Sequence, residues 1–356
     1  MILHSGTAVP ADVTYLPSEL DTVRWGRLPC AADDPVLSID AGTEIVIDTL
    51  SHEGILEDQG RDPRAFFATH GVDAEQVLGD AVALAASDHP RTFGVDGPHV
   101  VTGPIEVRGA RVGDLLAMTV LDTTRRVPYG VISNRHGKGA LPGEFPLGEG
   151  TFSAFAAVED RPDGAVGVLP LTPGGDRRAR FGLRPFLGVM GVAVAGAVRP
   201  HTVPPGPFGG NIDINLLTVG STLYLPVQAD GALAYVGDPH FAQGDGEVAL
   251  TAMEASLRVT VGFDVIARED AVARFGDVAG PLAETSEYLV PTGMDEDLDL
   301  AVQNCVRAAI GLLQARFGMD PSLALAYLSA ATDFNISQVV DVVKGVHARI
   351  RKDDFL

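Results

Sequence analysis

The chain has 356 residues, enough to bury one large hydrophobic core, or two smaller ones, without disulfides or a structural metal. Hydrophobic residues make up 46% of it and charged residues 21%, which is typical of a globular protein and unlike disordered or membrane-spanning chains. The net charge of -21 repels phosphate backbones and anionic lipid headgroups, and no Lys/Arg cluster offsets it locally. We therefore expect neither nucleic acid nor a membrane as a partner.

The N-terminal residues bear on the location of the protein, and the cysteines bear on disulfides and thiolate metal sites. The first residues carry no basic region, apolar region or cleavage site of a signal peptide, so we expect a cytoplasmic location. Cys30 and Cys305 are the two cysteines of the chain, too few for a disulfide framework or a thiolate zinc site. Cys305 lies on the apolar side of a predicted helix, where a cysteine is typically an inert small hydrophobe and not a nucleophile.

The first third of the chain mixes short strands with one helix. Alternating side chains over 44–48 predict a strand that runs into the polar turn 51–54, which carries His52 and Glu53. Such a turn can hold site residues, although a purely structural turn is the simpler interpretation. Asp73 and Gln76 have the spacing of a capping box, and apolar residues at helical spacing then predict a helix up to residue 85.

The middle of the chain is rich in β-structure. Residues 99–122 predict two strands joined by a turn at 113–114, and residues 187–198 predict a buried strand. Residues 160–180 are loaded with Pro, Gly and charge and predict an exposed loop. We place a soft boundary there, between an N-terminal β-rich part (1–160) and a C-terminal β-rich part (181–356), with one intertwined domain as the alternative.

The C-terminal region predicts a helical hairpin. Apolar residues recur at helical spacing over 298–317 and Gly318 follows, while Asp320 and Pro321 are suited to cap and begin a second helix. Alternation over 346–350 predicts a last strand. Because regular strand–helix alternation is absent, we expect an α+β protein that is mainly β and not a doubly wound sheet.

Polar and glycine residues gather between 204 and 254 more densely than a core requires. Carboxylates and imidazoles of this kind suit zinc or a similar divalent ion, and Asp238 and His240 share one face of a predicted strand. No phosphate-binding loop, nucleophile elbow or HExxH pattern is present. The candidate metal ligands and bases are His99, Asp213, Asp238, His240, Asp245, Glu247 and Glu254.

Each of these candidates also has a simpler interpretation. Asp213 follows two glycines and an asparagine and is suited to a turn, as is the Asp245-Gly246 pair in a hairpin. His240 fits a solvated surface imidazole, and Glu254 lies in a loosely alternating run whose glutamate would ordinarily be solvated. Spacing alone leaves both alternatives open.

Ordered motifs over most of the chain resemble the acetamidase/formamidase family of amide hydrolases. The first is His99-x-x-Thr102-Gly103-Pro104, and the second is Pro205-Gly206-x-x-Gly209-Gly210-Asn211-x-Asp213. The third is the run from Gly237-Asp238-x-His240 through Gln243-Gly244-Asp245-Gly246-Glu247 to Glu254, and 337–341 resembles the C-terminal segment of the family. Ser51 departs from the aspartate of family members, and this departure beside His52 and Glu53 implies a reshaped pocket or an altered ligand set.

The resemblance implies a β-sandwich or barrel-like fold with a C-terminal helical hairpin, homo-oligomers, and hydrolysis of small aliphatic amides to a carboxylate and ammonia. It implies a divalent metal, with zinc expected and calcium as the alternative. On this hypothesis the metal activates a water. The predicted ligands are His99, Asp213 and His240, with Asp238 as a further ligand or as the group that orients an imidazole.

The same hypothesis assigns the remaining roles. Glu254 or Glu247 moves the proton from water to the departing amine, and Asn211 donates to the developing oxyanion. A rival from another class is a β-rich binding protein whose carboxylates hold a structural calcium without turnover. A third alternative is hydrolysis of a larger or cyclic amide, which would need a larger pocket than formamide or acetamide does.

Overall fold

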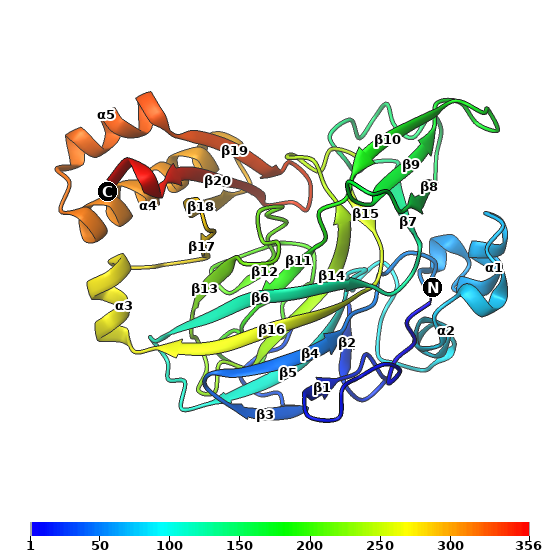
Figure 1. Ribbon diagram of the computed structural model, residues 1–356, viewed down its shortest axis with the longest axis horizontal. Coiled ribbons are helices and arrows are strands. Elements are labelled where there is room, and N and C mark those ends of the chain that lie inside the picture. The colour runs from blue at the N-terminus through cyan, green and yellow to red at the C-terminus, as the bar shows by residue number, and fades with distance from the viewer. Residues whose placement is uncertain (1, 356) are drawn as a thin grey trace.

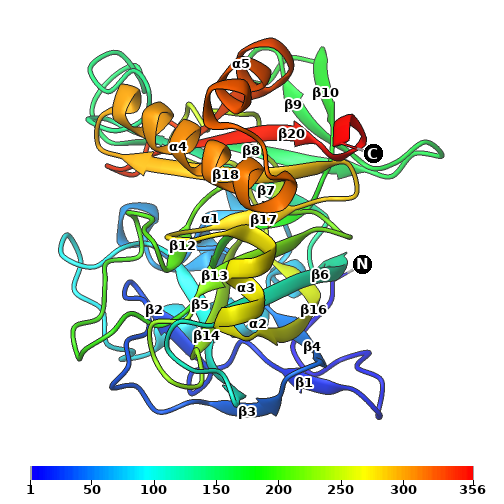
Figure 2. The ribbon, with the colours of Figure 1, turned by 90° about the vertical axis from the view of Figure 1, so that its left-hand side faces the viewer.

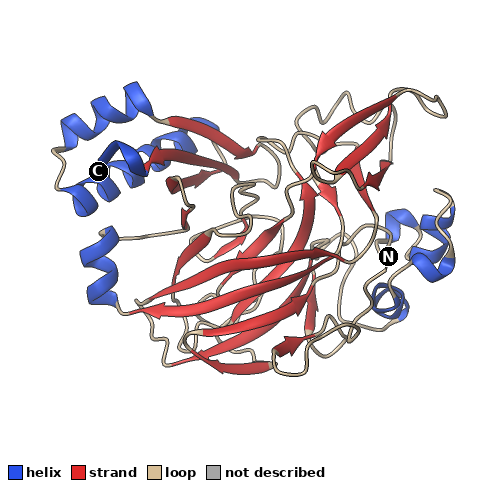
Figure 3. Cartoon of the chain, viewed as in Figure 1, coloured by secondary structure: helices blue, strands red, loops and turns tan. Residues whose placement is uncertain are grey.

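The computed structural model describes residues 2–355 and is dominated by two β-sheets (Figure 1). Strands fill the middle of the molecule, with helices α3, α4 and α5 at one end and α1 and α2 at the other (Figure 3). The prediction of a mainly β α+β fold with a C-terminal helical hairpin is confirmed. No helix within 2–355 is both long and apolar enough to cross a bilayer.

The first sheet has nine strands in the order β1-β4-β16-β6-β13-β17-β18-β20-β19. Apart from the parallel β1–β4 pair, its neighbours run antiparallel. Its strands are β1 (Thr14–Leu16), β4 (Thr43–Asp48), β6 (Leu115–Arg125), β13 (Thr222–Pro226), β16 (Leu257–Ile266), β17 (Leu282–Glu284), β18 (Tyr288–Asp295), β19 (Asp333–Gln338) and β20 (Lys344–Arg351).

The second sheet has eleven strands, eight of them in the order β10-β9-β8-β7-β15-β14-β11-β12, with β5 joining β14 to β2 and β3. The paired strands β14 and β15 carry several of the candidate site residues. Its strands are β2 (Val23–Trp25), β3 (Leu37–Asp40), β5 (Val100–Arg108), β7 (Tyr129–Arg135), β8 (Thr151–Glu159), β9 (Val166–Pro170), β10 (Arg178–Gly182), β11 (Phe186–Gly191), β12 (Gly209–Asn211), β14 (Ala234–Ala242) and β15 (Met253–Glu254).

The two largest clusters of buried hydrophobic residues hold these layers together. The larger contains Ile47 and Phe263 from the first sheet with Leu187 and Val236 from the second, so the sheets pack face to face as in a sandwich. The smaller lies where α3, α4 and α5 cover β13, β18 and β20 (Figure 2). The helices are α1 (Pro63–Ala68), α2 (Gly79–Ala86), α3 (Arg268–Phe275), α4 (Leu298–Phe317) and α5 (Pro321–Ala331), with 3-10 turns at Glu57–Gln59, Ala74–Gln76 and Lys352–Phe355.

The ends of the helical hairpin follow the sequence signals. Gly318 caps α4 in the left-handed conformation with φ of 64°, and the side chain of Asp320 accepts hydrogen bonds from the first turn of α5. Pro321 is the first residue of α5. The predicted helical hairpin therefore has the caps expected of it.

Three local predictions were wrong in detail. The buried strand expected over 187–198 ends at Gly191 as β11, and Val198 is 81% exposed. The helix expected from the Asp73 cap to residue 85 is interrupted, because Val77 is extended and separates a 3-10 turn from α2. Tertiary burial of Val77 and Leu78 outweighs their helical spacing. Residues 160–180 are not one loop, since β9 lies within them and β10 begins there, and the two strands pair antiparallel.

The parts 1–160 and 181–356 both supply strands to both sheets. β1, β4 and β6 of the N-terminal part lie in the first sheet beside β13 and β16 to β20 of the C-terminal part. In the second sheet β5 pairs with β14, and β7 pairs with β15. We propose on this basis that the two parts form one intertwined domain.

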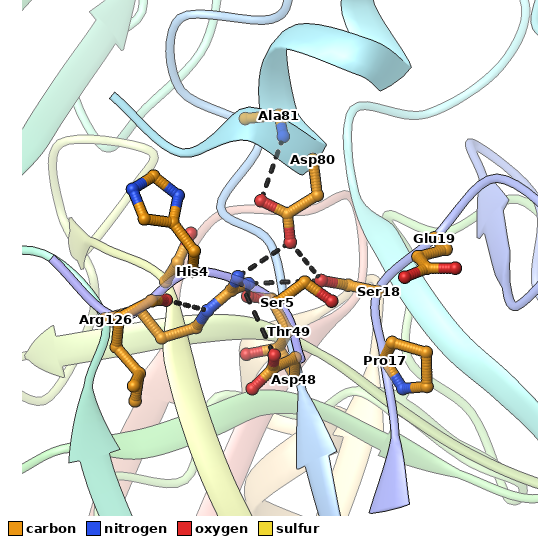
Figure 4. A network of polar contacts seen from close by, with 12 residues as sticks. His4, Ser5, Pro17, Ser18, Glu19, Asp48, Thr49, Asp80, Ala81 and Arg126 are labelled. Carbon is orange, nitrogen blue, oxygen red and sulfur yellow. Dashed lines mark hydrogen bonds and ion pairs between the residues drawn. The ribbon is translucent and has the colours of Figure 1, made fainter. Parts of the chain in front are cut away.

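A buried arginine ties together several segments of the N-terminal part of the chain (Figure 4). Arg126 has no exposed surface, and its guanidinium contacts Asp80 of α2 at 2.7 Å and the Ser18 hydroxyl at 3.1 Å. It also donates to the carbonyl oxygen of Thr49 at 3.1 Å, directly after β4. Asp48 in turn binds Arg258 at 2.6 Å. This network fixes the chain that leads into the turn carrying His52.

Candidate active site

A cleft of about 760 Å³ opens between segments that are far apart in the sequence. This volume falls within the range of small-molecule sites in proteins, roughly 300–1,000 Å³. The turn after β4, the residue before β5, and strands β12, β14 and β15 all reach it, as does the segment after β19. The polar residues at its base are His52, His99, Asn211, Asp238, Glu247, Glu254 and Asp341, and each is buried.

His240 lies beneath this cleft between two carboxylates. Alternation along β14 places His240 on the same face as Asp238, and Glu254 pairs with His240 in register across β14 and β15. Nε2 of His240 is 3.0 Å from Oδ2 of Asp238 and 3.0 Å from Oε1 of Glu254. The three side chains converge because one strand pair carries all of them.

The Nδ1 atoms of His240 and His99 are each hydrogen-bonded to a neutral oxygen acceptor. Nδ1 of His240 donates to the amide oxygen of Gln243 at 3.1 Å, and Nδ1 of His99 donates to the backbone oxygen of Thr202 at 3.2 Å. Such bonds fix the tautomer and leave Nε2 with a lone pair. In His240 that lone pair faces two carboxylate oxygens, an arrangement that requires a proton or a cation between them.

Asp213 and Glu247 form a second group around His240. Asp213 follows β12 with φ of 47°, and neither of its buried carboxylate oxygens has a hydrogen-bond partner among the described residues. One ligand atom each from Asp213, His240 and Glu247 lie within 4.8 Å of one another. Gln243 donates to the backbone oxygen of Asp213 at 2.9 Å. The same side chain accepts the hydrogen bond from Nδ1 of His240, so Gln243 connects Asp213 to His240.

His99 and His52 complete the cluster on the other side of Asp238. Nε2 of His99 lies 3.9 Å from Oδ1 of Asp238, and Nδ1 of His52 lies 3.4 Å from the same oxygen. The sequence placed His52 only at a polar turn. Its neighbour Glu53 accepts a hydrogen bond from Ser133 at 2.6 Å and lies 3.6 Å from Arg135. The turn that carries His52 and Glu53 is thus part of the wall of the site. Its position after a predicted strand was compatible with this role and also with a purely structural turn.

Asn211 reaches the cleft from β12 and is bonded to Asp341, a residue absent from the predicted site. Nδ2 of Asn211 donates one hydrogen to Oδ2 of Asp341 at 3.0 Å, which leaves its second hydrogen for another acceptor. Gln338 donates to the backbone oxygen of Asn211 at 3.0 Å. Asp341 has a φ of 65°. The sequence signal that could have identified Asp341 as a site residue was its place in the C-terminal motif 337–341.

Asp245 is the candidate that lies apart from this cluster. Its carboxylate accepts hydrogen bonds from the side chains of Asn215 at 2.8 Å and Asn335 at 2.6 Å. It does not line the cleft, and it connects the loop after β14 to β19. The structural interpretation therefore suits Asp245 better than a role as a ligand.

The donor set fits a bound cation. Five buried carboxylates, those of Asp213, Asp238, Glu247, Glu254 and Asp341, share one small volume. Burial, reinforced by the charge of Asp238, raises the pKa of Glu254 to about 7, and burial together with Asp213 raises the pKa of Glu247. Buried carboxylates that repel one another in this way are stabilised by a positive ion among them.

A glycine leaves room at the centre of the cluster. A Cβ at Gly188 on β11 would lie 2.5 Å from Oδ1 of Asp213, 2.6 Å from Oδ2 of Asp238 and 2.6 Å from Cε1 of His240. Any larger residue would push these groups apart. The residues present therefore fit a metal ion of the kind that imidazole and carboxylate ligands bind.

Comparisons with known proteins agree with this geometry. The model of the acetamidase/formamidase family matches residues 188–350, which include β11, β12, β14 and β15. A formamidase of Methylophilus methylotrophus is 29% identical over 306 residues, covering 68% of this chain and 74% of that protein. An acetamidase of Mycolicibacterium smegmatis is 28% identical over 205 residues, and the match spans about half of its length (49%).

A solved structure extends the likeness to nearly the whole chain. The acetamidase of Bacillus halodurans superposes with a TM-score of 0.72 at 26% identity, covering 96% of this chain and 98% of that one. The match includes both sheets and the C-terminal helices, beyond the region matched by the family model. Residues 188–350 are therefore similar to the acetamidase/formamidase family, and the resemblance that the motifs predicted is confirmed.

Proposed function

We propose that this protein hydrolyses the C–N bond of a small linear amide of the formamide or acetamide type, releasing a carboxylate and ammonia. The observation that carries the proposal is the placement of His240 against Asp238 and Glu254 at the base of the cleft. Similarity to a formamidase and to acetamidases supports the choice of substrate class.

We propose zinc as the ion of this centre, held by His99, Asp213 and His240 with Asp238 as a further ligand. The imidazoles of His99 and His240 lie 3.9 Å and 3.0 Å from the carboxylate of Asp238 and favour zinc over calcium, which prefers oxygen ligands. When bound, the ion supplies Lewis acidity that polarises an amide carbonyl and lowers the pKa of a water. The hydrogen bonds from His99 to Thr202 and from His240 to Gln243 hold Nε2 of each ring ready for it.

Glu254 is the proposed proton carrier. Its pKa of about 7 lets the carboxylate accept a proton from the attacking water and return it to the departing nitrogen near neutral pH. The C–N bond breaks as that nitrogen is protonated, and the water oxygen stays with the carboxylate product. Oε2 of Glu254 has no partner among the described residues and can take the proton. Glu247, also buried with a free oxygen, is the alternative base.

Asn211 is proposed to stabilise the oxyanion. One hydrogen of its amide is bonded to Asp341, which fixes the orientation of the side chain toward the cleft. The second hydrogen can be donated to the carbonyl oxygen as negative charge develops on it. A single well-placed donor of this kind is worth about 3 kcal/mol in the transition state.

The size of the cleft supports a second candidate substrate. A volume of about 760 Å³ is far more than the few heavy atoms of formamide or acetamide occupy. A larger or cyclic amide would fill it better, with the same reacting groups at its base. Exposed apolar side chains at the mouth, such as Phe93 and Val342, are 62% and 58% exposed and support our further proposal of a homo-oligomer.

An ammonia-release assay tests the proposed reaction. We expect release from formamide, acetamide or a longer amide, and the preferred chain length reports which part of the cleft the substrate fills. Glu254→Gln should lower kcat by about 10²–10⁴-fold, the usual contribution of a positioned acid–base group. Glu144→Gln, on an exposed loop, is the matched control and should leave kcat unchanged. Absence of ammonia release from every amide would overturn the proposal.

A further inference from the structure

We propose that a second cavity, on the other side of Gln243 from the cleft, binds a small molecule that carries a carboxylate or phosphate group. The cavity has a volume of about 540 Å³ and lies between the ends of β11 and β14 and the C-terminal strands β18 and β20. Arg184, Arg349 and His347 line it, together with hydroxyl and amide side chains such as Thr285 and Asn215. Its residues are not those of the proposed amide site.

Two arginines in this cavity have no ionic partner among residues 2–355. Arg184 directly precedes β11 and is exposed, and its guanidinium forms neither an ion pair nor a hydrogen bond with a described residue. Arg349 of β20 stacks on the ring of Tyr288 at 5.0 Å and donates to the Tyr288 hydroxyl at 3.3 Å. Its Nε is buried and has no acceptor. A buried donor without an acceptor is costly, and an oxyanion would supply one.

His347 is a third polar group of the cavity with a nitrogen that lacks a hydrogen-bond partner among the described residues. It is 1% exposed, and Nδ1 lies 2.8 Å from the Ser337 hydroxyl. Burial lowers the pKa of His347 to about 4, so the ring is neutral at pH 7. When Ser337 donates to Nδ1, Nε2 carries the ring hydrogen, and that buried nitrogen has no acceptor. His347 and Arg349 are two residues apart on β20 and so share one face of the strand.

The acidic groups of the cavity form no salt bridge with Arg184 or Arg349, although the charge of Asp245 contributes to the raised pKa of Arg349. Both carboxylate oxygens of Asp245 accept hydrogen bonds, from Asn215 and from Asn335. Glu287 is exposed at the turn between β17 and β18 and forms no ion pair with a described residue. The donors without an acceptor among the described residues are therefore the guanidinium of Arg184, Nε of Arg349 and Nε2 of His347. A planar guanidinium binds carboxylate or phosphate oxygens in pairs, which identifies the class of ligand.

This cavity shares a residue with the support of the candidate active site. Gln243 lines it, and its side chain donates to the backbone oxygen of Ser337 at 3.2 Å. The amide oxygen of Gln243 accepts from Nδ1 of His240 at 3.1 Å. His347 is thus three hydrogen bonds from His240, by way of Ser337 and Gln243, and a ligand bonded to His347 is four away.

Calorimetric titration of the full-length protein with inorganic phosphate and with acetate tests the proposal. We expect saturable binding of at least one anion at constant ionic strength set by chloride, and the anion that binds identifies the phosphate or carboxylate class. Arg184→Gln should weaken binding at least tenfold, since a charged hydrogen bond contributes about 1.5–3 kcal/mol. Arg349→Gln should act in the same direction, with folding checked by circular dichroism.

Arg177→Gln is the matched control, because Arg177 is an exposed arginine at which the same charge is removed outside the cavity. Its affinity should equal that of the wild type. Equal affinity in Arg184→Gln and wild type would place the anion elsewhere, for example at the amide site, and would overturn the proposal. So would the absence of saturable binding of both anions. Neither result depends on amide hydrolysis. The anion-binding proposal is therefore tested independently of the proposed function.

Discussion

His240 and Glu254 face each other across the β14–β15 pair, with Nε2 of the histidine 3.0 Å from Oε1 of the glutamate. Glu254 belongs to a strand of only two residues, and that strand also pairs with β7. Register between strands, and not proximity in the sequence, brings acid and imidazole together. A change that shifts β15 relative to β14 would separate them.

Gly188→Ala should disable the centre with little change in fold. The added Cβ would meet the carboxylates of Asp213 and Asp238 and the ring of His240 at 2.5–2.6 Å, so these groups must move apart. We expect ammonia release and bound metal to fall at least tenfold together. Gly182→Ala on β10 meets nothing within 4 Å and is the control. Wild-type metal content and activity in Gly188→Ala would show that the centre lies elsewhere.

Arg126→Met should destabilise the protein by about 3–5 kcal/mol, because it leaves the carboxylate of Asp80 buried without its cation. The neighbouring Arg125→Met removes an ion pair with Asp160 whose carboxylate is largely exposed, and should cost about 0–1 kcal/mol. Urea unfolding of the two variants measures the difference. Similar losses in both would contradict the structural role of the Arg126 network.

Much of the fold follows from local signals. Alternation predicted β4 and the shared face of Asp238 and His240 on β14, and the Gly318 and Asp320 caps predicted the ends of the helical hairpin. Each of these depends on neighbours in the sequence. Ordered motifs predicted the resemblance to the acetamidase/formamidase family, which the comparisons confirm, because these motifs span most of the chain.

Long-range placement could not be predicted from the same signals. β5 and β6 follow one another across the turn at 113–114 yet belong to different sheets, which strand patterns do not reveal. His52 and Asp341 reach the cleft from opposite ends of the chain. Their place in the site depends on how the sheets pack, and a turn residue after a strand looks the same whether it faces solvent or a cleft.

Cys305 should be dispensable for activity. Burial raises the pKa of its thiol to about 12, so the thiolate needed for nucleophilic attack is scarce at neutral pH. The thiol donates to the backbone oxygen of Pro291 at 3.3 Å beneath α4. Cys305→Ala should retain wild-type kcat, and the thiol should react with a disulfide reagent only on unfolding. Loss of kcat in a folded Cys305→Ala variant would contradict this role.

Glu284 should contribute a pH-dependent part of the stability. Burial acts to raise its pKa, but the hydrogen bond from Lys352 at 2.8 Å and the charges of Lys352 and Arg274 outweigh burial and lower the pKa below its ordinary value of 4.5. A lowered pKa in the folded state stabilises the protein above pH 4.5, and the contribution disappears as the pH falls through the folded value.

The free energies of unfolding of wild type and Glu284→Gln, measured between pH 7 and pH 3, test this account. The wild type should be the more stable at pH 7, and the two should approach each other as the solution becomes acidic. A difference that stays constant over this range would mean that the ion pair with Lys352 contributes nothing that depends on ionisation.

Metal content and ammonia release, measured on one preparation of the purified protein before chelation, after chelation and after zinc is returned, test the central claim most directly. We predict that both quantities fall together on chelation, that zinc restores both in the wild type, and that it restores neither in His240→Ala. Undiminished amide hydrolysis by the wild type after its metal has been removed would contradict the account.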